Sequence, residues 1–148
     1  YLGINAKMNE FEAAMGLLNL NYVDEAIKKR KMLYETYLKC LSGLENENRV
    51  KVIRPKENVN YNYAYFTIKF ESNEVRDYLF EKLAEYNVFS KKYFYPPCNE
   101  FPAYDFERNT PIAKNVSDTI LSLPIYFNLE IEDVKQICKI IEVIISDL

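Results

Sequence analysis

The sequence predicts an α+β fold in which a small antiparallel sheet is covered by helices on one face. Long stretches with apolar residues three and four positions apart indicate amphipathic helices. Shorter stretches rich in β-branched and aromatic residues alternate with a period of two, which indicates strands with one buried face. The 148 residues contain no internal repeat and suffice for one hydrophobic core, so we expect a single α+β domain.

Residues 1–46 are predicted to be helical. Apolar residues recur at helical spacing from position 9 to 44, and the polar run at 19–21 divides them into two helices. Asp24 and Glu25 suit the positive end of the second helix. We expect Ser42 and Gly43 to close it, with the glycine in the left-handed cap conformation.

Residues 47–148 are predicted to form the α+β sandwich. The expected elements are strands at 50–53 and 61–70, a helix from Ser72 or Asn73 to Tyr86, a strand at 88–93, a helix at 111–119, a strand at 120–123 and a helix at 131–145. Pro111 suits the first turn of its helix. Residues 94–110 are expected to form a loop of a length that proteins usually keep for function.

The composition excludes several classes of site. A net charge of −3 with interspersed signs argues against nucleic acid as a partner. The chain has no histidine, which excludes a histidine-based triad and a histidine-ligated zinc site, and no metal is expected. Three widely spaced cysteines fit free thiols in a reducing compartment. The first residues lack a basic region followed by an apolar run, and no stretch approaches about 20 apolar residues, so we expect neither a leader nor a membrane span. We expect a cytoplasmic protein with no membrane contact.

Four ordered blocks of sequence carry a family resemblance. They are the run at 3–18, with Gly3, Asn5, Lys7 and Met8, the helix that follows at 20–37, the loop at 92–104 with its Tyr-Phe-Tyr-Pro-Pro, and Leu-Ser-Leu-Pro-Ile-Tyr at 121–126. Together they resemble the DegT/DnrJ/StrS family of pyridoxal-phosphate (PLP) sugar aminotransferases. The resemblance implies the C-terminal domain of a fold-type I PLP aminotransferase, with 1–46 as a helical interdomain or dimer segment. The cofactor-binding domain and the Schiff-base lysine are then expected upstream of this chain.

Asn5 is the first site residue that the resemblance implies. In the family this asparagine reaches across a dimer interface and donates a hydrogen bond to the phosphate of the neighbour's PLP, which implies a homodimer. Taken alone, the residues favour an ordinary turn or helix N-cap at Asn5. Lys7 stands where arginine is commoner, so a phosphate contact there becomes a weaker point-charge contact.

The loop at 93–100 is the second candidate, as a wall of the substrate pocket. The resemblance places Tyr93, Tyr95 and Asn99 there as substrate-binding residues. Asn99 occupies a position where many relatives carry histidine, and an amide can hydrogen-bond a sugar hydroxyl but cannot act as a base. Cys98 has no histidine to activate it as a nucleophile. The alternative is a proline-rich surface loop without function.

The resemblance implies a ping-pong transfer of an amino group from an amino acid, usually glutamate, to a nucleotide-linked keto sugar. Such sugars serve cell-surface polysaccharide biosynthesis. This chain alone lacks the lysine, the carboxylate and the stacking ring that PLP chemistry needs, so we expect it to hold no PLP and to be inactive by itself. Two alternatives remain: a non-catalytic dimerisation or binding module, and the sugar-dehydratase branch, in which histidine replaces the upstream lysine.

Overall fold

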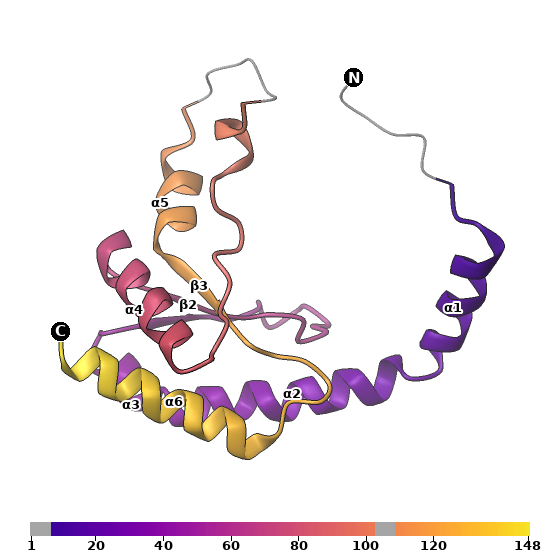
Figure 1. Ribbon diagram of the computed structural model, residues 1–148, viewed down its shortest axis with the longest axis horizontal. Coiled ribbons are helices and arrows are strands. Elements are labelled where there is room, and N and C mark those ends of the chain that lie inside the picture. The colour runs from indigo at the N-terminus through magenta and orange to yellow at the C-terminus, as the bar shows by residue number, and fades with distance from the viewer. Residues whose placement is uncertain (1–6, 103–108) are drawn as a thin grey trace.

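The computed structural model describes residues 7–102 and 109–148 (Figure 1). In chain order its elements are α1 (Glu10–Leu20), α2 (Val23–Cys40), α3 (Ser42–Asn46), β1 (Lys51–Ile53), β2 (Phe66–Lys69), α4 (Asn73–Glu85), the 3-10 helix η1 (Cys98–Glu100), α5 (Pro111–Thr119), β3 (Ile120–Leu123) and α6 (Ile131–Ser146).

The three strands form one antiparallel sheet in the order β1-β2-β3. Val52 pairs with Ile68, and Ile68 pairs with Leu121 on its other side, so the three inward side chains lie in one row across the sheet. The next row joins Phe66 to Leu123. This register places Phe66 and Ile68, the apolar residues of the period-two pattern in β2, on the same face as Val52, Leu121 and Leu123.

Helices α2, α4 and α6 complete the core on that face. In Figure 1, α2 and α6 run side by side below the sheet, and they pack against each other. The core joins the inward strand residues to buried side chains of these helices, among them Leu33, Tyr37, Leu79, Leu83, Ile137 and Ile141. The predicted α+β fold with helices on one face is confirmed.

Two predicted strands are shorter in the structure. The predicted strand at 61–70 forms only at 66–69, because Tyr63 adopts a positive φ of 54° and cannot continue an extended chain. Instead, Tyr61 and Tyr63 pack edge-on against Tyr34 of α2. The predicted strand at 88–93 is reduced to a single bridge between Lys91 and Ser122.

The expected cap at Gly43 is wrong. Helix α2 ends at Cys40, and Gly43 lies inside the short helix α3. The left-handed backbone appears five residues later, at Asn48, with a φ of 57°. The extra turn of helix brings Leu44 into the core, where it is 8% exposed, and this burial explains why the chain does not turn at the glycine.

Helix α1 differs from the other α-helices because it buries no residue. Asn9 caps it: its side chain accepts a hydrogen bond from the backbone of Glu12, whose carboxylate accepts one from the Asn9 backbone in return. Figure 1 shows α1 projecting away from the body. In the part of the chain that the structure describes, no helix is long and apolar enough to cross a membrane.

Candidate functional site

The outer face of the sheet carries a pocket of about 250 Å³. Its floor is formed by Thr67 of β2 and Ser122 of β3, which alternate with core residues and therefore point away from the core. Their hydroxyl oxygens lie 3.0 Å apart. The remaining lining residues are Ile53, Arg54, Pro55, Tyr61, Tyr65, Tyr93 and Phe94. The pocket thus combines a hydroxyl floor with aromatic walls.

Tyr93 and Phe94 bring the 92–97 segment to this pocket. The ring of Tyr93 packs edge-on against Tyr65 with 5.6 Å between centroids, and it stacks on Phe94 at 4.8 Å. Tyr93 keeps 38% of its surface exposed and Phe94 keeps 67%. Both rings therefore retain area with which a ligand could make contact.

Arg54 supplies the positive charge at the edge of the pocket. Its guanidinium makes a forked pair with Glu45 of α3, with 2.6 Å from Nη1 to Oε1. The hydrogen bond from Arg54 lowers the pKa of the Glu45 carboxyl, and the same bond raises the pKa of Arg54. Because the forked pair holds the guanidinium in one orientation, Arg54 is a fixed cation at this rim.

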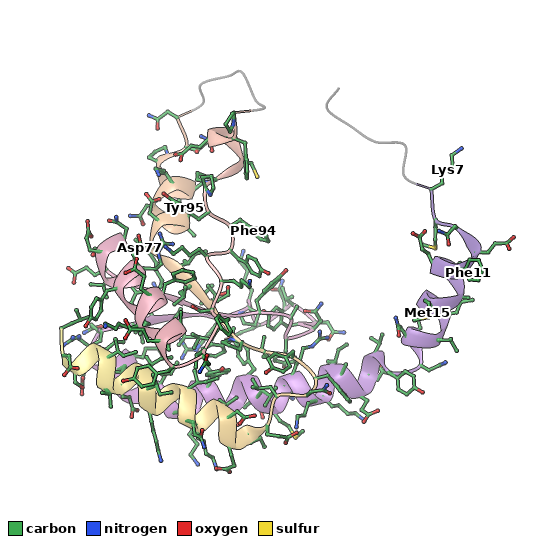
Figure 2. The ribbon with its side chains drawn as sticks, viewed as in Figure 1. Lys7, Phe11, Met15, Asp77, Phe94 and Tyr95 are labelled. Carbon is green, nitrogen blue, oxygen red and sulfur yellow. The ribbon has the colours of Figure 1, made fainter. Side chains whose placement is uncertain are left out.

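Tyr95 and Asn99, the other two predicted pocket residues, lie on the α5 side of the loop. The ring of Tyr95 faces two cations, with its centroid 5.2 Å from Cζ of Arg76 and 5.7 Å from Nζ of Lys114. Asn99 Oδ1 accepts a hydrogen bond from the Thr110 hydroxyl at 3.2 Å. Figure 2 shows Tyr95 beside α5 and Phe94 on the opposite side of the loop. Neither Tyr95 nor Asn99 lines the pocket, and their contact with substrate stays a prediction.

The predicted cofactor residues are remote from the pocket. Asn5 lies outside the described residues. Lys7 is exposed and precedes α1, and Figure 2 places it far from Phe94 within this one chain. The fold of a single chain therefore does not bring Lys7 to the pocket that Tyr93 lines.

Sequence reasoning missed Arg54, Thr67 and Ser122. The signal for Thr67 was present, because it belongs to the polar half of the period-two pattern in β2. Ser122 lies in the Leu-Ser-Leu-Pro block, but only the register with β2 brings its hydroxyl to Thr67. Arg54 follows β1 directly, and nothing in its local sequence marks it. Within 7–102 and 109–148, no group of three metal-ligating side chains occurs.

The order of these elements and the loop before α5 match a known group of proteins. Residues 1–142 match the model of the DegT/DnrJ/EryC1/StrS aminotransferase family. The chain belongs to this family. The predicted membership is therefore confirmed.

Relatives within the family show what the chain is similar to. It is 37% identical over 146 residues to the dTDP-4-amino-4,6-dideoxy-D-glucose transaminase of Escherichia coli, an alignment that covers 94% of this chain and 38% of that enzyme. It is 28% identical to the GDP-perosamine synthase of Escherichia coli O157:H7, covering 99% and 39% respectively.

A solved structure confirms the fold. The PLP form of Spr1654 from Streptococcus pneumoniae superimposes with a TM-score of 0.84 at 22% identity, over 95% of this chain and 36% of that one. The chain thus spans well under half the length of the family members that it matches.

Proposed function

We propose that this chain is the C-terminal domain of a PLP-dependent aminotransferase that transfers an amino group to a nucleotide-linked keto sugar. The observation that carries the proposal is the outer pocket, because the family loop at 92–97 supplies two of its walls through Tyr93 and Phe94. Relatives named for a dTDP-linked and a GDP-linked amino sugar support this substrate class. We place the protein in the cytoplasm, in the biosynthesis of cell-surface polysaccharide.

The chemistry of the pocket suits a sugar. Aromatic faces pack against the C–H surfaces of a sugar ring, and Tyr93 and Phe94 offer such faces. The hydroxyls of Thr67 and Ser122 both donate and accept hydrogen bonds, as sugar hydroxyls do. Arg54 at the rim can donate hydrogen bonds to a linked diphosphate, although Glu45 already balances its charge.

The same pocket does not fit PLP. Among the described residues, its lining contains no lysine for a covalent attachment and no carboxylate for the pyridine nitrogen. The pocket therefore offers no group for the covalent steps of amino transfer. PLP, which supplies the electron sink for amino transfer, belongs in this proposal to the rest of the protein.

In this proposal, Asn5 connects this C-terminal domain with the PLP site in the rest of the protein. Its side-chain amide donates to the phosphate of the PLP bound by a second subunit, and Lys7 adds a weaker charge contact. The protein is then a homodimer with shared active sites.

The non-catalytic alternative draws support from α1, whose apolar side chains are exposed and could form a dimer surface without chemistry. The dehydratase alternative is less well supported, because both relatives above are named for amino sugars.

The test uses the full-length protein purified with PLP. L-glutamate should remove the visible absorbance of the bound cofactor, and a dTDP- or GDP-linked keto sugar should restore it, with an aminated sugar detected by mass spectrometry. A deoxygenated, non-aminated product would indicate the dehydratase branch instead. A stable dimer that binds no PLP would support the non-catalytic module.

Subunit mixing tests the shared site. Neither an Asn5→Ala subunit nor a subunit lacking the upstream lysine should be active as a homodimer. If Asn5 acts in trans, dimers mixed from the two variants should regain activity, since one of their two sites has both residues. Asn21→Ala, which changes an exposed amide beyond α1, is the matched control, and its homodimer should be active without mixing. Lack of recovery in the mixed dimers would place Asn5 outside the neighbour's site.

A further inference from the structure

Arg76 of α4 is 1% exposed although it carries a charge. Its Nη1 donates to the backbone oxygens of Ser117 at 3.0 Å and of Ile120 at 3.3 Å, and its Nε donates to Asp77. A buried guanidinium is tolerated only when such partners replace water. Arg76 therefore fixes α4 to the junction between α5 and β3.

Asp77 extends this connection to the loop. Its carboxylate binds both Arg76 and Lys92, the residue that directly precedes Tyr93. Partial burial alone would raise the pKa of Asp77, but the hydrogen bonds from Lys92 and Arg76 outweigh it and the pKa is lowered. The Lys92 ammonium also lies 4.5 Å from the ring centroid of Phe80 on α4. The start of the loop is thus held to α4 by an ion pair with Asp77 and a cation–π contact with Phe80.

The next two residues are held as well. The Ser117 hydroxyl donates to the backbone oxygen of Phe94 at 2.7 Å, and the ring of Tyr95 lies 5.2 Å from the Arg76 guanidinium. The segment is therefore attached to α4 and α5 through Lys92, the Phe94 backbone and Tyr95. The side chains of Tyr93 and Phe94 are left on the other side, as walls of the pocket. Figure 2 shows Asp77 and Tyr95 together on the α4 and α5 side.

We infer that Arg76 and Asp77 are positioning residues that hold the 92–95 segment so that Tyr93 and Phe94 receive the keto sugar nucleotide. This inference rests on the proposed function. Arg76 and Asp77 then matter for the half-reaction with the keto sugar nucleotide and not for the half-reaction with the amino-acid donor, because the donor does not need a pocket for a sugar. In this inference Tyr95 helps to anchor the segment by its contact with Arg76 and does not contact the substrate.

The decisive variant is Asp77→Asn in the full-length holoenzyme, which keeps the side-chain shape but removes the charge that holds Lys92. Misplaced substrate-binding groups cost up to about a hundredfold in rate, so we expect kcat/KM for the keto sugar nucleotide to fall by roughly tenfold. We expect kcat/KM for glutamate to stay within about twofold, because no transition-state contact to the donor is lost. Asp77→Glu should recover part of the loss, and Asp147→Asn, an exposed aspartate at the end of α6, should lose nothing. An equal loss for both substrates, or no loss, would overturn the inference.

A second measurement does not depend on activity. Hydrogen exchange in Asp77→Asn should be faster in peptides that cover 91–97 and unchanged in peptides from α6. If the wild-type protein does not transaminate and this change is still seen, the proposed function fails, but the finding that Asp77 holds the 92–95 segment stands. If exchange at 91–97 is unchanged, the positioning role fails. Should Asp77→Asn not fold, Lys92→Met removes the same link from the loop side and is read in the same way.

Discussion

Helix α1 and the body that follows it, which runs from α2 to α6, both carry regularly spaced apolar residues, but only the body buries them. Phe11 of α1 is 86% exposed, whereas Leu33 of α2 and Phe66 of β2 are fully buried. The two helices are separated only by Asn21 and Tyr22. Helical periodicity thus shows which face of a helix is apolar, but it does not show whether the same chain supplies the surface that covers it.

The two regions are held together by different forces. Helix α1 has a local device, the capping box between Asn9 and Glu12, and no buried side chain. The body is held by a continuous core that joins α2, α4 and α6 to the sheet. An isolated helix of 11 residues is marginal in water, so the geometry of α1 depends far more on its cap than that of α4 does.

The largest test of this contrast compares Phe66→Ala with Phe11→Ala. Removing the buried ring of Phe66, which stacks on Tyr37, should lower the free energy of unfolding by about 3–5 kcal/mol. Removing the exposed ring of Phe11 should change it by less than about 0.5 kcal/mol. Urea unfolding of the 148-residue chain measures both. A comparable loss in the two variants would mean that α1 packs on the body in solution.

Removing a buried and an exposed tyrosine hydroxyl should change the free energy of unfolding by different, smaller amounts. The hydroxyl of Tyr37 donates to the backbone oxygen of Pro124 at 2.9 Å, and burial raises the pKa of Tyr37 far above its ordinary value. Tyr37→Phe leaves that carbonyl without its donor and should cost about 1–3 kcal/mol. Tyr22→Phe, at a tyrosine that is 63% exposed, is the matched control and should cost nothing measurable. Equal unfolding midpoints for the two variants would contradict the role of this hydrogen bond.

The body was largely predictable because its elements carry strong local signals. Strand β3 was predicted at 120–123 with the observed bounds, and α6 and α4 within one residue at either end. Val134, Ile137, Ile141 and Ile145 recur at helical spacing and are all buried. The residues at 61–65 were mispredicted because alternation also arises when tyrosines pack on a helix through a non-extended backbone.

The candidate site was only partly predictable. Tyr93 was predicted from the family loop, and the structure places it in the pocket. Thr67 and Ser122 meet through strand pairing 55 residues apart in sequence, a long-range contact that no local pattern encodes. Arg76 and Asp77 look like ordinary helix charges in the sequence, and only burial and the contact with Lys92 distinguish them.

Removing a helix cap should have different effects in the two regions, with a change in the free energy of unfolding of about 1 kcal/mol in the body. Ser72→Ala removes the cap of α4 and should lower the stability of the whole body by about 0.5–2 kcal/mol while α4 stays helical. Asn9→Ala should leave the body's stability unchanged but unwind the first turns of α1, since packing does not hold them. Backbone chemical shifts report the local helix, and urea unfolding reports the body. A loss of body stability in Asn9→Ala would show that the regions are coupled.

The smallest expected effect concerns pH and the pair between Glu45 and Arg54. The hydrogen bond from Arg54 lowers the pKa of Glu45 in the folded chain, so the pair stabilises the fold at pH values above the ordinary glutamate pKa of about 4.3. That contribution disappears as the pH falls through the lowered pKa and Glu45 takes up a proton. Because Arg54 is 48% exposed, solvent screening limits the contribution to less than about 1 kcal/mol.

Glu45→Gln should therefore be slightly less stable than the wild-type chain at neutral pH, and the difference should vanish in acid. Glu12→Gln, which changes the capping box of α1, should leave the unfolding of the body unchanged at every pH, because α1 shares no buried contact with it. Urea unfolding of the three chains at neutral and acidic pH measures this. A pH-independent deficit in Glu45→Gln would mean that the side chain acts through its contact with the Val52 backbone, 3.1 Å away, rather than through its charge.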